Sequence, residues 1–203
     1  MLLVIDHNNR AMEHRALRTM FEARKRVFID LLKWDLPALA GCYELDQFDD
    51  VHATYLIVTD GEADHLASAR LLQTTRPALL DSLFPELVSG AIPHGPDIVE
   101  ITRFCLSPGI GARRRREARD TLLVALVEHA LVHDISTYVG VADLAWFRQI
   151  QTFGWDCEAL GAPMLHGGQA LTALRIDIDA ATPAKLAAAG IAAADGARAA
   201  HAA

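Results

Sequence analysis

The sequence predicts a single α/β domain of three layers, in which helices cover both faces of a mixed, mostly antiparallel sheet. Two observations lead to this fold class. In the first half of the chain, two apolar and β-branched segments, 53–59 and 65–73, flank the turn residues Asp60 and Gly61, a pattern typical of a β-hairpin. In the second half, strand-like segments alternate with segments of helical periodicity. A chain of 203 residues is long enough for one such domain with a sizeable core.

Before the hairpin, we expect a short strand at 2–5 and a helical segment from 11 to about 34, with or without one break. One face of this helix is apolar at spacings of three and four residues, but it contains Arg24 where a leucine is expected. Segment 35–50 ends in the acidic run 44–50 and is expected to be a long loop. Its aromatic and apolar residues favour a functional loop over a disordered one.

After the hairpin, the expected elements alternate between helix and strand. They are a helix at 74–88, a strand at 97–106, a helix at 113–133, a strand at 136–141, a helix at 144–153, a short strand between Gly154 and Gly161, and a last strand at 170–178. The alanine-rich segment after Asp179 is expected to be a weak helix or a frayed tail. The predicted domain therefore covers 1–180, followed by a tail at 181–203.

Composition excludes several classes of protein. The chain is 52% hydrophobic and 22% charged, a globular balance, and no apolar run reaches the length of about 20 residues that a membrane span needs. The net charge of -7 opposes nucleic-acid binding. Three cysteines without a pattern argue against disulfides and zinc, and nine histidines show no metal-like spacing. We expect a cytoplasmic protein with no membrane, nucleic-acid or metal partner.

The strand at 97–106 contains two charged residues, Glu100 and Arg103, among core-forming neighbours. Strict alternation places these two side chains on opposite faces of the sheet. Both can serve one site only if the strand bulges or splays, and bulges are frequent beside active sites. The sequence therefore predicts an irregular central strand.

Three arginines occupy positions where apolar residues are expected, and three carboxylates are available to pair with them. The six residues are Arg24, Arg70, Arg103, Asp46, Asp49 and Glu100. Taken singly, the arginines fit structural ion pairs that fix the acidic loop on the sheet. As a set, the six residues indicate an electrostatically tuned cleft. Because a carboxylate on a strand is rigidly held, Glu100 is the candidate general base.

Two further features fit ligand binding. A glycine loop at 107–111 precedes the basic run Arg113 to Arg116 at the start of a helix, where positive charge opposes the helix dipole. This run is either a solvated charge cluster or a site for an anionic partner such as a phosphopantetheine arm, the CoA pyrophosphate or an acidic carrier protein. Phe28 and Trp34 lie at the end of the arginine-bearing helix, and an aromatic pair beside carboxylates suits a cation such as a sulfonium.

Five segments together resemble a known family. They are Arg24-Lys-Arg-Val-Phe28, Trp34, Glu44-Leu-Asp46-Gln-Phe-Asp49, Ala69-Arg70-Leu-Leu and Glu100-Ile-Thr-Arg103-Phe. In order and spacing they are similar to the LuxI-type acyl-homoserine lactone synthases, from about residue 3 to 179. The resemblance implies a GNAT-like acyltransferase fold with a splayed central strand. It also implies the synthesis of a quorum-sensing signal from S-adenosylmethionine and an acyl thioester of acyl carrier protein or CoA, with release of methylthioadenosine.

The resemblance also implies a role for each site residue. Glu100 would be the base, with Asp46 as the competing candidate. Arg24, Phe28 and Trp34 would cover S-adenosylmethionine, which is a substrate, so that no cofactor is expected. Asp46, Asp49, Arg70 and Arg103 would form the ion network, and Arg113, Arg114, Arg115 and Arg116 would face the carrier protein or phosphopantetheine. The acyl-chain pocket would include Phe104, Val127, Gly140, Ala142, Trp146 and Trp155.

One departure from the family concerns the product. Synthases of 3-oxo products tend to have threonine where this chain has Gly140, so we expect an unsubstituted or 3-hydroxy acyl chain. Two other functions stay open. One is a GNAT-type N-acyltransferase that uses acyl-CoA and another amine. The other is a non-catalytic relative that senses acyl carrier protein.

Overall fold

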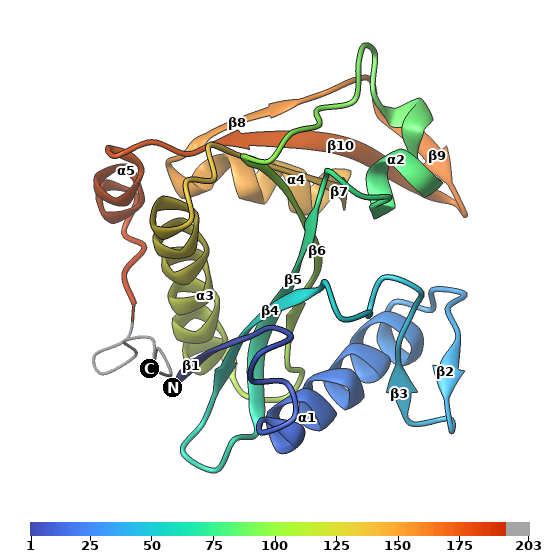
Figure 1. The fold of residues 1–203 in the computed structure, drawn as a ribbon, viewed down its shortest axis with the longest axis vertical. Coiled ribbons are helices and arrows are strands. Elements are labelled where there is room, and N and C mark those ends of the chain that lie inside the picture. The colour runs from blue at the N-terminus through green and yellow to red at the C-terminus, as the bar shows by residue number, and fades with distance from the viewer. Residues whose placement is uncertain (194–203) are drawn as a thin grey trace. The chain divides into compact units, whose positions relative to one another are not determined.

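The computed structural model describes residues 1–193 (Figure 1). These residues form two compact units. The first unit comprises mainly Met1–Leu71 and Arg103–Leu126, and the second comprises Leu72–Thr102 and Val127–Ile191. Within 1–193, none of the helices is both long enough and apolar enough to cross a bilayer.

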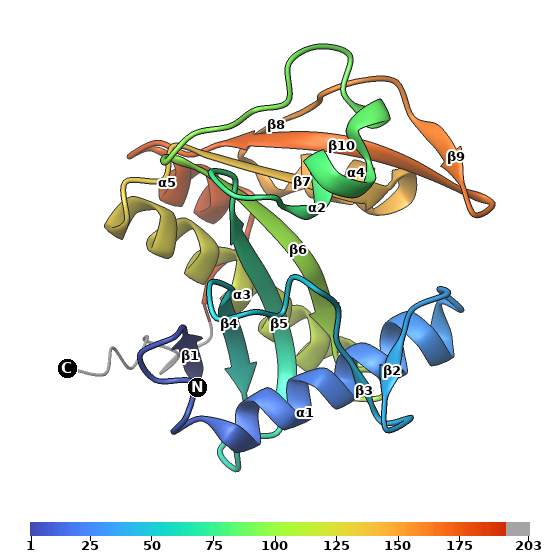
Figure 2. The same cartoon turned by 45° about the vertical axis from the view of Figure 1, so that its right-hand side comes forward.

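The first unit contains a four-stranded part of the sheet with helices on both faces. Hydrogen bonding orders its strands β1-β4-β5-β6, with β1 antiparallel to β4 and β4 antiparallel to β5. Figures 1 and 2 show α1 and α3 on opposite faces of these strands. The elements are β1 (Leu2–Ile5), α1 (His14–Arg24), the π-helix η1 (Lys25–Leu31), β2 (Ala38–Leu39), β3 (Tyr43–Glu44), β4 (Thr54–Thr59), β5 (His65–Gln73), β6 (Ile98–Leu106) and α3 (Ala112–Val132), of which β5, β6 and α3 continue into the second unit.

The second unit contains the strands β6-β7-β10-β8, with β9 also paired to β10. β6 is parallel to β7, whereas β10 is antiparallel to β7, β8 and β9. The elements are α2 (Leu79–Leu83), the 3-10 helices η2 (Pro85–Leu87) and η3 (Gln151–Phe153), β7 (Thr137–Asp143), α4 (Leu144–Ile150), β8 (Asp156–Ala159), β9 (Met164–His166), β10 (Gln169–Asp177) and α5 (Thr182–Ala188). The predicted fold class, a mixed and mostly antiparallel sheet with helices, is confirmed.

Local sequence explains where the elements of the second unit begin and pack. Asp143 ends β7 and caps α4, because its carboxylate accepts the N–H groups of Ala145 and Trp146 at 3.0 Å. Leu80 of α2 and Leu87 of η2 are buried against Val139 of β7 in one apolar cluster. Burial of a leucine side chain is worth about 1.5–3 kcal/mol, so this cluster holds α2 and η2 on the sheet.

Two element predictions differ from the structure. The helical segment expected from 11 to 34 has the break that the prediction allowed, because the regular turns of α1 change to the π-helix η1 at Lys25. The loop expected at 35–50 contains the β2–β3 hairpin. The helix expected from 74 begins only at Leu79, because Ala78 after the proline is extended, with φ -121° and ψ -175°. Pro77 thus stands outside the helix and not in its first turn.

The segment expected to be a tail contains α5 in its described part. Leu186 of this helix is 1% exposed, and the α5 backbone approaches Gly154 so closely that a Cβ there would lie 2.5 Å from the Lys185 carbonyl oxygen. Residues 182–188 are thus packed on the second unit. The expected tail also includes 194–203, which lie outside the described residues.

β6 is irregular where the sequence predicts it to be. Its parallel register with β7 pairs Glu100 with Val139. Arg103 then has a φ of +51°, in the left-handed region that costs an L-residue about 1–2 kcal/mol. The simple alternation of faces therefore does not extend through Arg103.

The carbonyl of Ile101 and the Cα of Gly140 approach each other closely in the second unit. A Cβ at position 140 would lie 2.8 Å from the Ile101 oxygen, and backbone cannot move away as a flexible side chain can. We predict that Gly140→Ala lowers the free energy of unfolding by about 1–3 kcal/mol, as overpacking usually does.

Urea denaturation measures this loss. Gly90→Ala is the matched control, because a Cβ there meets nothing within 4 Å and Gly90 does not have a left-handed φ. Equal stability of Gly140→Ala and the wild type would show that β6 and β7 tolerate separation at this point.

Candidate active site

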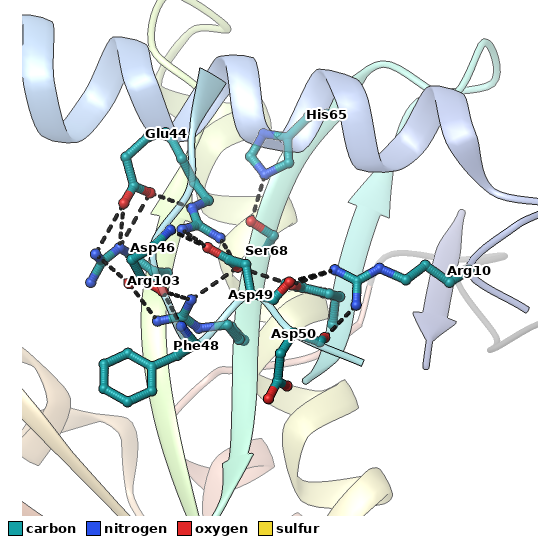
Figure 3. A network of polar contacts seen from close by, with 12 residues as sticks. Arg10, Glu44, Asp46, Phe48, Asp49, Asp50, His65, Ser68 and Arg103 are labelled. Atoms are coloured by element: carbon teal, nitrogen blue, oxygen red, sulfur yellow. Dashed lines mark hydrogen bonds and ion pairs between the residues drawn. The ribbon is translucent and has the colours of Figure 1, made fainter. Parts of the chain in front are cut away.

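The first unit contains a buried network of three arginines and three carboxylates (Figure 3). Arg24 at the end of α1 forms a bidentate pair with Asp49, with Nη1–Oδ1 and Nη2–Oδ2 distances of 2.8 and 2.9 Å. Its Nε donates to Oε2 of Glu44 on β3 at 2.5 Å. Arg24 and Glu44 are both 0% exposed, so each charge depends on the other for its compensation.

Two strand arginines complete the network. Arg70 on β5 contacts both oxygens of Asp46, at 2.5 and 3.0 Å, and its Nη1 lies 2.9 Å from Asp49. Arg103 on β6 donates to Glu44 at 3.0 Å and to Asp46 at 2.7 Å. Of the six residues predicted to form one set, Arg24, Asp46, Asp49, Arg70 and Arg103 are thus brought together, but the third carboxylate of the network is Glu44 and not the predicted Glu100. Ion pairs therefore attach segment 44–49 to α1, β5 and β6.

The charges shift one another's proton affinities. Burial alone would raise the pKa of Asp49, but the hydrogen bonds and charge of Arg24, together with the charge of Arg70, hold it well below the usual 3.8. Burial likewise opposes the charge on Arg24, yet Asp49 and Glu44 raise the pKa of its guanidinium above its ordinary value. Asp49 and Arg24 are therefore a permanently ionised pair near neutral pH.

Sequence reasoning missed three members of this network. Glu44 was part of the resemblance but had no assigned role, although the i, i+2 spacing to Asp46 is a signal that both face one side of an extended segment. The Tyr55 hydroxyl on β4 donates to Asp49 at 2.9 Å. Arg10 donates to that hydroxyl at 3.1 Å and to the carbonyl oxygens of Asp49 and Asp50. Arg10 and Tyr55 carried no sequence signal because each stands alone in an ordinary segment.

Aromatic rings lie against the network. Phe28 in the π-helix stacks on Trp34, with ring centroids 4.9 Å apart and planes at 14°. The Arg103 guanidinium carbon lies 5.7 Å from the Phe28 ring centroid, and that of Arg70 lies 5.8 Å from the Phe48 centroid. The predicted aromatic pair is therefore formed, and it lies beside Arg103. π-helical turns occur frequently at functional sites.

Glu100 lies in the second unit. Its side chain is 0% exposed, and the Leu80 N–H in the first turn of α2 donates to its two oxygens at 3.0 and 3.1 Å. The carboxylate lines a cavity of about 180 Å³, whose walls include Thr74, Leu80, Asp81, Ile92, His94 and Glu100. Glu100 is thus a buried acid that a backbone amide orients beside an open space.

Most residues predicted for the acyl pocket belong to the second unit. Glu100 pairs with Val139, and Val139 packs with Leu80, so both side chains face α2. Alternation along β7 places Gly140 and Ala142 on the face opposite Val139. The face of β7 that bears the two residues predicted for the acyl pocket therefore lies across the sheet from the Glu100 cavity.

The remaining acyl-pocket residues have mixed environments. Trp146 and Trp155 each contact the Phe153 ring edge-on, at centroid distances of 5.8 and 6.0 Å. Trp155 is 5% exposed, and its indole N–H donates to the Ile150 carbonyl at 2.9 Å, as expected of a core residue. Val127 is buried on α3, and Phe104 is half-buried in the first unit.

The basic run at the start of α3 has internal partners in the first unit. Arg115 donates to the carbonyl oxygens of Leu106 and Ser107 at 3.1 and 3.2 Å. Arg113 and Arg114 lie 3.5 Å from Glu117 and Asp60, respectively. Arg116 is exposed, as are the other three arginines. Arg115 therefore supports the glycine loop, and the stability of the helix start does not depend on an external anion.

Two other candidate centres are inert. Burial raises the pKa of the Cys105 thiol to about 12, which keeps it protonated. Ser107 and His65 are hydrogen-bonded, but burial, with the charges of Arg26 and Arg24, lowers the pKa of His65 to about 3, and both side chains are enclosed. Among residues 1–193, no group of three potential metal ligands comes together.

Solved structures identify the class of protein that this fold and site define. The chain superimposes on a CoA-dependent acyl-homoserine lactone synthase, BjaI, with S-adenosylmethionine and isopentyl-CoA bound. The TM-score is 0.85 at 26% identity, over 94% of this chain and 90% of that one. An N-acetyltransferase of Lactobacillus plantarum matches with a TM-score of 0.56 at 15% identity, over 88% and 99% of the two chains, and shares the fold alone.

The sequence comparisons agree. The model of the autoinducer synthase family matches residues 8–186, so the chain belongs to this family of acyltransferases. An acyl-homoserine-lactone synthase of Ralstonia nicotianae is 32% identical over 170 residues, which cover 80% of this chain and 82% of that protein. The family resemblance inferred from the five sequence segments is confirmed.

The depressed pKa of Asp49 predicts a loss of stability in acid. A carboxylate whose folded pKa lies below its unfolded value stabilises the fold above the unfolded pKa, and this contribution falls as the pH drops through and below about 4. We expect the free energy of unfolding to fall by about 1 kcal/mol per pH unit from this group alone.

Chemical denaturation between pH 6 and pH 3 tests this dependence. Asp49→Asn should be less stable at pH 6 and should show a shallower decline, whereas Asp30→Asn, in an exposed pair with Lys25, should keep the wild-type slope. A wild-type slope in Asp49→Asn would show that other groups cause the acid sensitivity.

Proposed function

We propose that the chain is an acyl-homoserine lactone synthase that acylates the amine of S-adenosylmethionine with Glu100 as the general base. The amine of S-adenosylmethionine enters as its ammonium form and first gives one of its three protons to Glu100, which leaves the neutral amine. Its nitrogen then bonds to the thioester carbonyl carbon, the C–S bond of the thioester breaks, and the second proton goes to the departing thiolate. In a second step the methionine carboxylate attacks its own γ-carbon. The sulfonium C–S bond breaks, the lactone closes and methylthioadenosine leaves.

The observation that carries the choice of base is the difference between Glu100 and Asp46. The oxygens of Asp46 accept from Arg70, Arg103 and the Phe48 N–H, so its lone pairs are already used by charged and backbone donors. Glu100 faces a cavity and is oriented by the neutral N–H of Leu80. A base must lie where a substrate proton can reach it, and Glu100 lines such a space, which favours Glu100.

The network in the first unit suits the binding of S-adenosylmethionine. Arg24, Phe28 and Trp34 would bind S-adenosylmethionine, whose sulfonium is a cation that the aromatic faces attract. Asp46, Asp49, Arg70 and Arg103, with Glu44, would keep this site rigid before substrate arrives, because all six charged groups of the network are paired. Phe104, Val127, Gly140, Ala142, Trp146 and Trp155 would line the acyl chain.

The acyl donor is a thioester of CoA or of acyl carrier protein. Similarity to BjaI and to MesI, both CoA-dependent, supports CoA, with MesI matching at a TM-score of 0.84 and 26% identity over the whole of both chains. Exposed Arg113, Arg114 and Arg116 would suit the phosphates of either carrier. Both substrates are cytoplasmic metabolites, and we place the activity there.

The alternative is a GNAT-type N-acyltransferase that uses acyl-CoA and another amine. Its fold is shared, but such an enzyme does not need a sulfonium site made of an arginine, two aromatic residues and an acidic loop. Release of methylthioadenosine separates the two functions, because only acylation followed by lactonisation of S-adenosylmethionine produces it.

Removal of the base tests the mechanism. Glu100→Gln keeps an oxygen for the Leu80 N–H but cannot take up a proton. We expect kcat to fall by about 10²- to 10⁴-fold, the usual contribution of a general base. Methylthioadenosine release is measured with S-adenosylmethionine and panels of acyl-CoA and acyl carrier protein thioesters. The exposed Glu86→Gln is the control, and full turnover by Glu100→Gln would exclude Glu100 as the base.

The product should have an unsubstituted or 3-hydroxy acyl chain. Mass spectrometry of the lactones made from matched 3-oxo, 3-hydroxy and unsubstituted donors measures this preference. We expect the 3-oxo lactone to be the minor product. A mainly 3-oxo product would show that Gly140 does not indicate a chain without a 3-oxo group. The family assignment would not change.

A further inference from the structure

In the proposed reaction Glu100 takes up a proton from the substrate, and this proton must then leave the enclosed site. Acylation moves two protons off the amine, and only one leaves with the thiol. The other stays on Glu100, whose side chain is 0% exposed, and it must reach solvent before the next turnover. The cavity of about 180 Å³ beside Glu100 can hold several water molecules, so protons can move through it.

His94 is the group in this cavity that suits proton transfer to solvent. It lines the same space as Glu100, and it is exposed, so one side chain borders both the cavity and bulk water. Histidine is the side chain that ordinarily exchanges protons near neutral pH. From the conservation of protons and this geometry, we propose that His94 is a proton-relay residue between Glu100 and solvent. The inference rests on the proposed role of Glu100.

Hydrogen bonds of the neighbouring residue fix the backbone next to His94. Pro93 precedes it, and Gly95 after it is bound at both backbone groups by Thr74, whose hydroxyl accepts the Gly95 N–H at 3.1 Å and lies 3.1 Å from its carbonyl oxygen. The same hydroxyl lies 2.8 Å from the carbonyl of Ile98, two residues before Glu100. Thr74 thus ties the His94 loop to the strand that presents the base.

Asp81 is the other titratable group that lines the cavity with Glu100 and His94. Its Oδ1 is already used, because it accepts the Ala78 N–H at 2.8 Å and the Ser82 hydroxyl at 3.0 Å, which caps α2. Asp81 therefore has a structural role in capping α2, and we assign the relay to His94.

A relay acts after the first acylation, which separates it from a structural residue. In a weak buffer, His94→Gln should complete the first turnover at the wild-type rate but should lower the steady-state rate by about tenfold, less than the loss of the base because cavity water still carries protons. Added imidazole should restore the steady-state rate. Because the steps of the first turnover are unaffected, kcat/KM for both substrates should be unchanged, and both Michaelis constants should fall with kcat.

The matched control is His52→Gln, which removes an exposed histidine of the first unit and should show neither the defect nor the rescue. A wild-type steady-state rate for His94→Gln in weak buffer, a slowed first turnover, or a defect that imidazole does not restore would each overturn the relay. The Glu100→Gln result separates the two proposals. If that variant is inactive while His94→Gln is normal, only the relay fails, and if it is fully active, the base assignment itself fails.

Discussion

The pairing of guanidinium and carboxylate groups in the first unit is the interaction on which the proposed S-adenosylmethionine site depends. Removing one partner of such a buried pair costs about 3–5 kcal/mol, because the other charge is left without compensation. Arg24, Glu44 and Asp49 are each at most 1% exposed, so the network is stable only when complete. Completeness requires that segment 44–49 lie in one position. The acidic loop is therefore ordered by these ion pairs, together with the burial of Phe48.

Strand β6 contains the backbone strain that this arrangement requires. It supplies Glu100 to the second unit and Arg103 to the first, and a regular strand would direct residues 100 and 103 to opposite faces. The left-handed backbone at Arg103 breaks the alternation. Its strain of about 1–2 kcal/mol is offset by the hydrogen bonds that Arg103 donates to Glu44 and Asp46. Backbone strain of this kind persists only where surrounding contacts fix the residue, as the ion pairs with Glu44 and Asp46 fix Arg103.

The sequence could predict the parts of this site that violate a local pattern. Arg24 interrupts an apolar helix face, and Glu100 and Arg103 interrupt a strand, so each was visible as an anomaly. Tyr55 was not visible, because a tyrosine in a strand is ordinary and only its hydrogen bond to Asp49 reveals its role. The β2–β3 hairpin and the π-helix η1 were hidden for a related reason. Tertiary contacts with the network, not local propensity, select them.

The two kinds of carboxylate environment suggest how the protein separates binding from proton transfer. Glu44, Asp46 and Asp49 are bonded to guanidinium groups, which use their lone pairs and keep them as fixed negative charges. Glu100 is oriented by a backbone amide beside a cavity. A fixed charge holds a cationic substrate well but makes a poor base, whereas a carboxylate beside a neutral donor can accept and release a proton. The protein therefore has acids of both kinds, and β6 carries the proposed base together with Arg103, which pairs with two carboxylates of the proposed binding site.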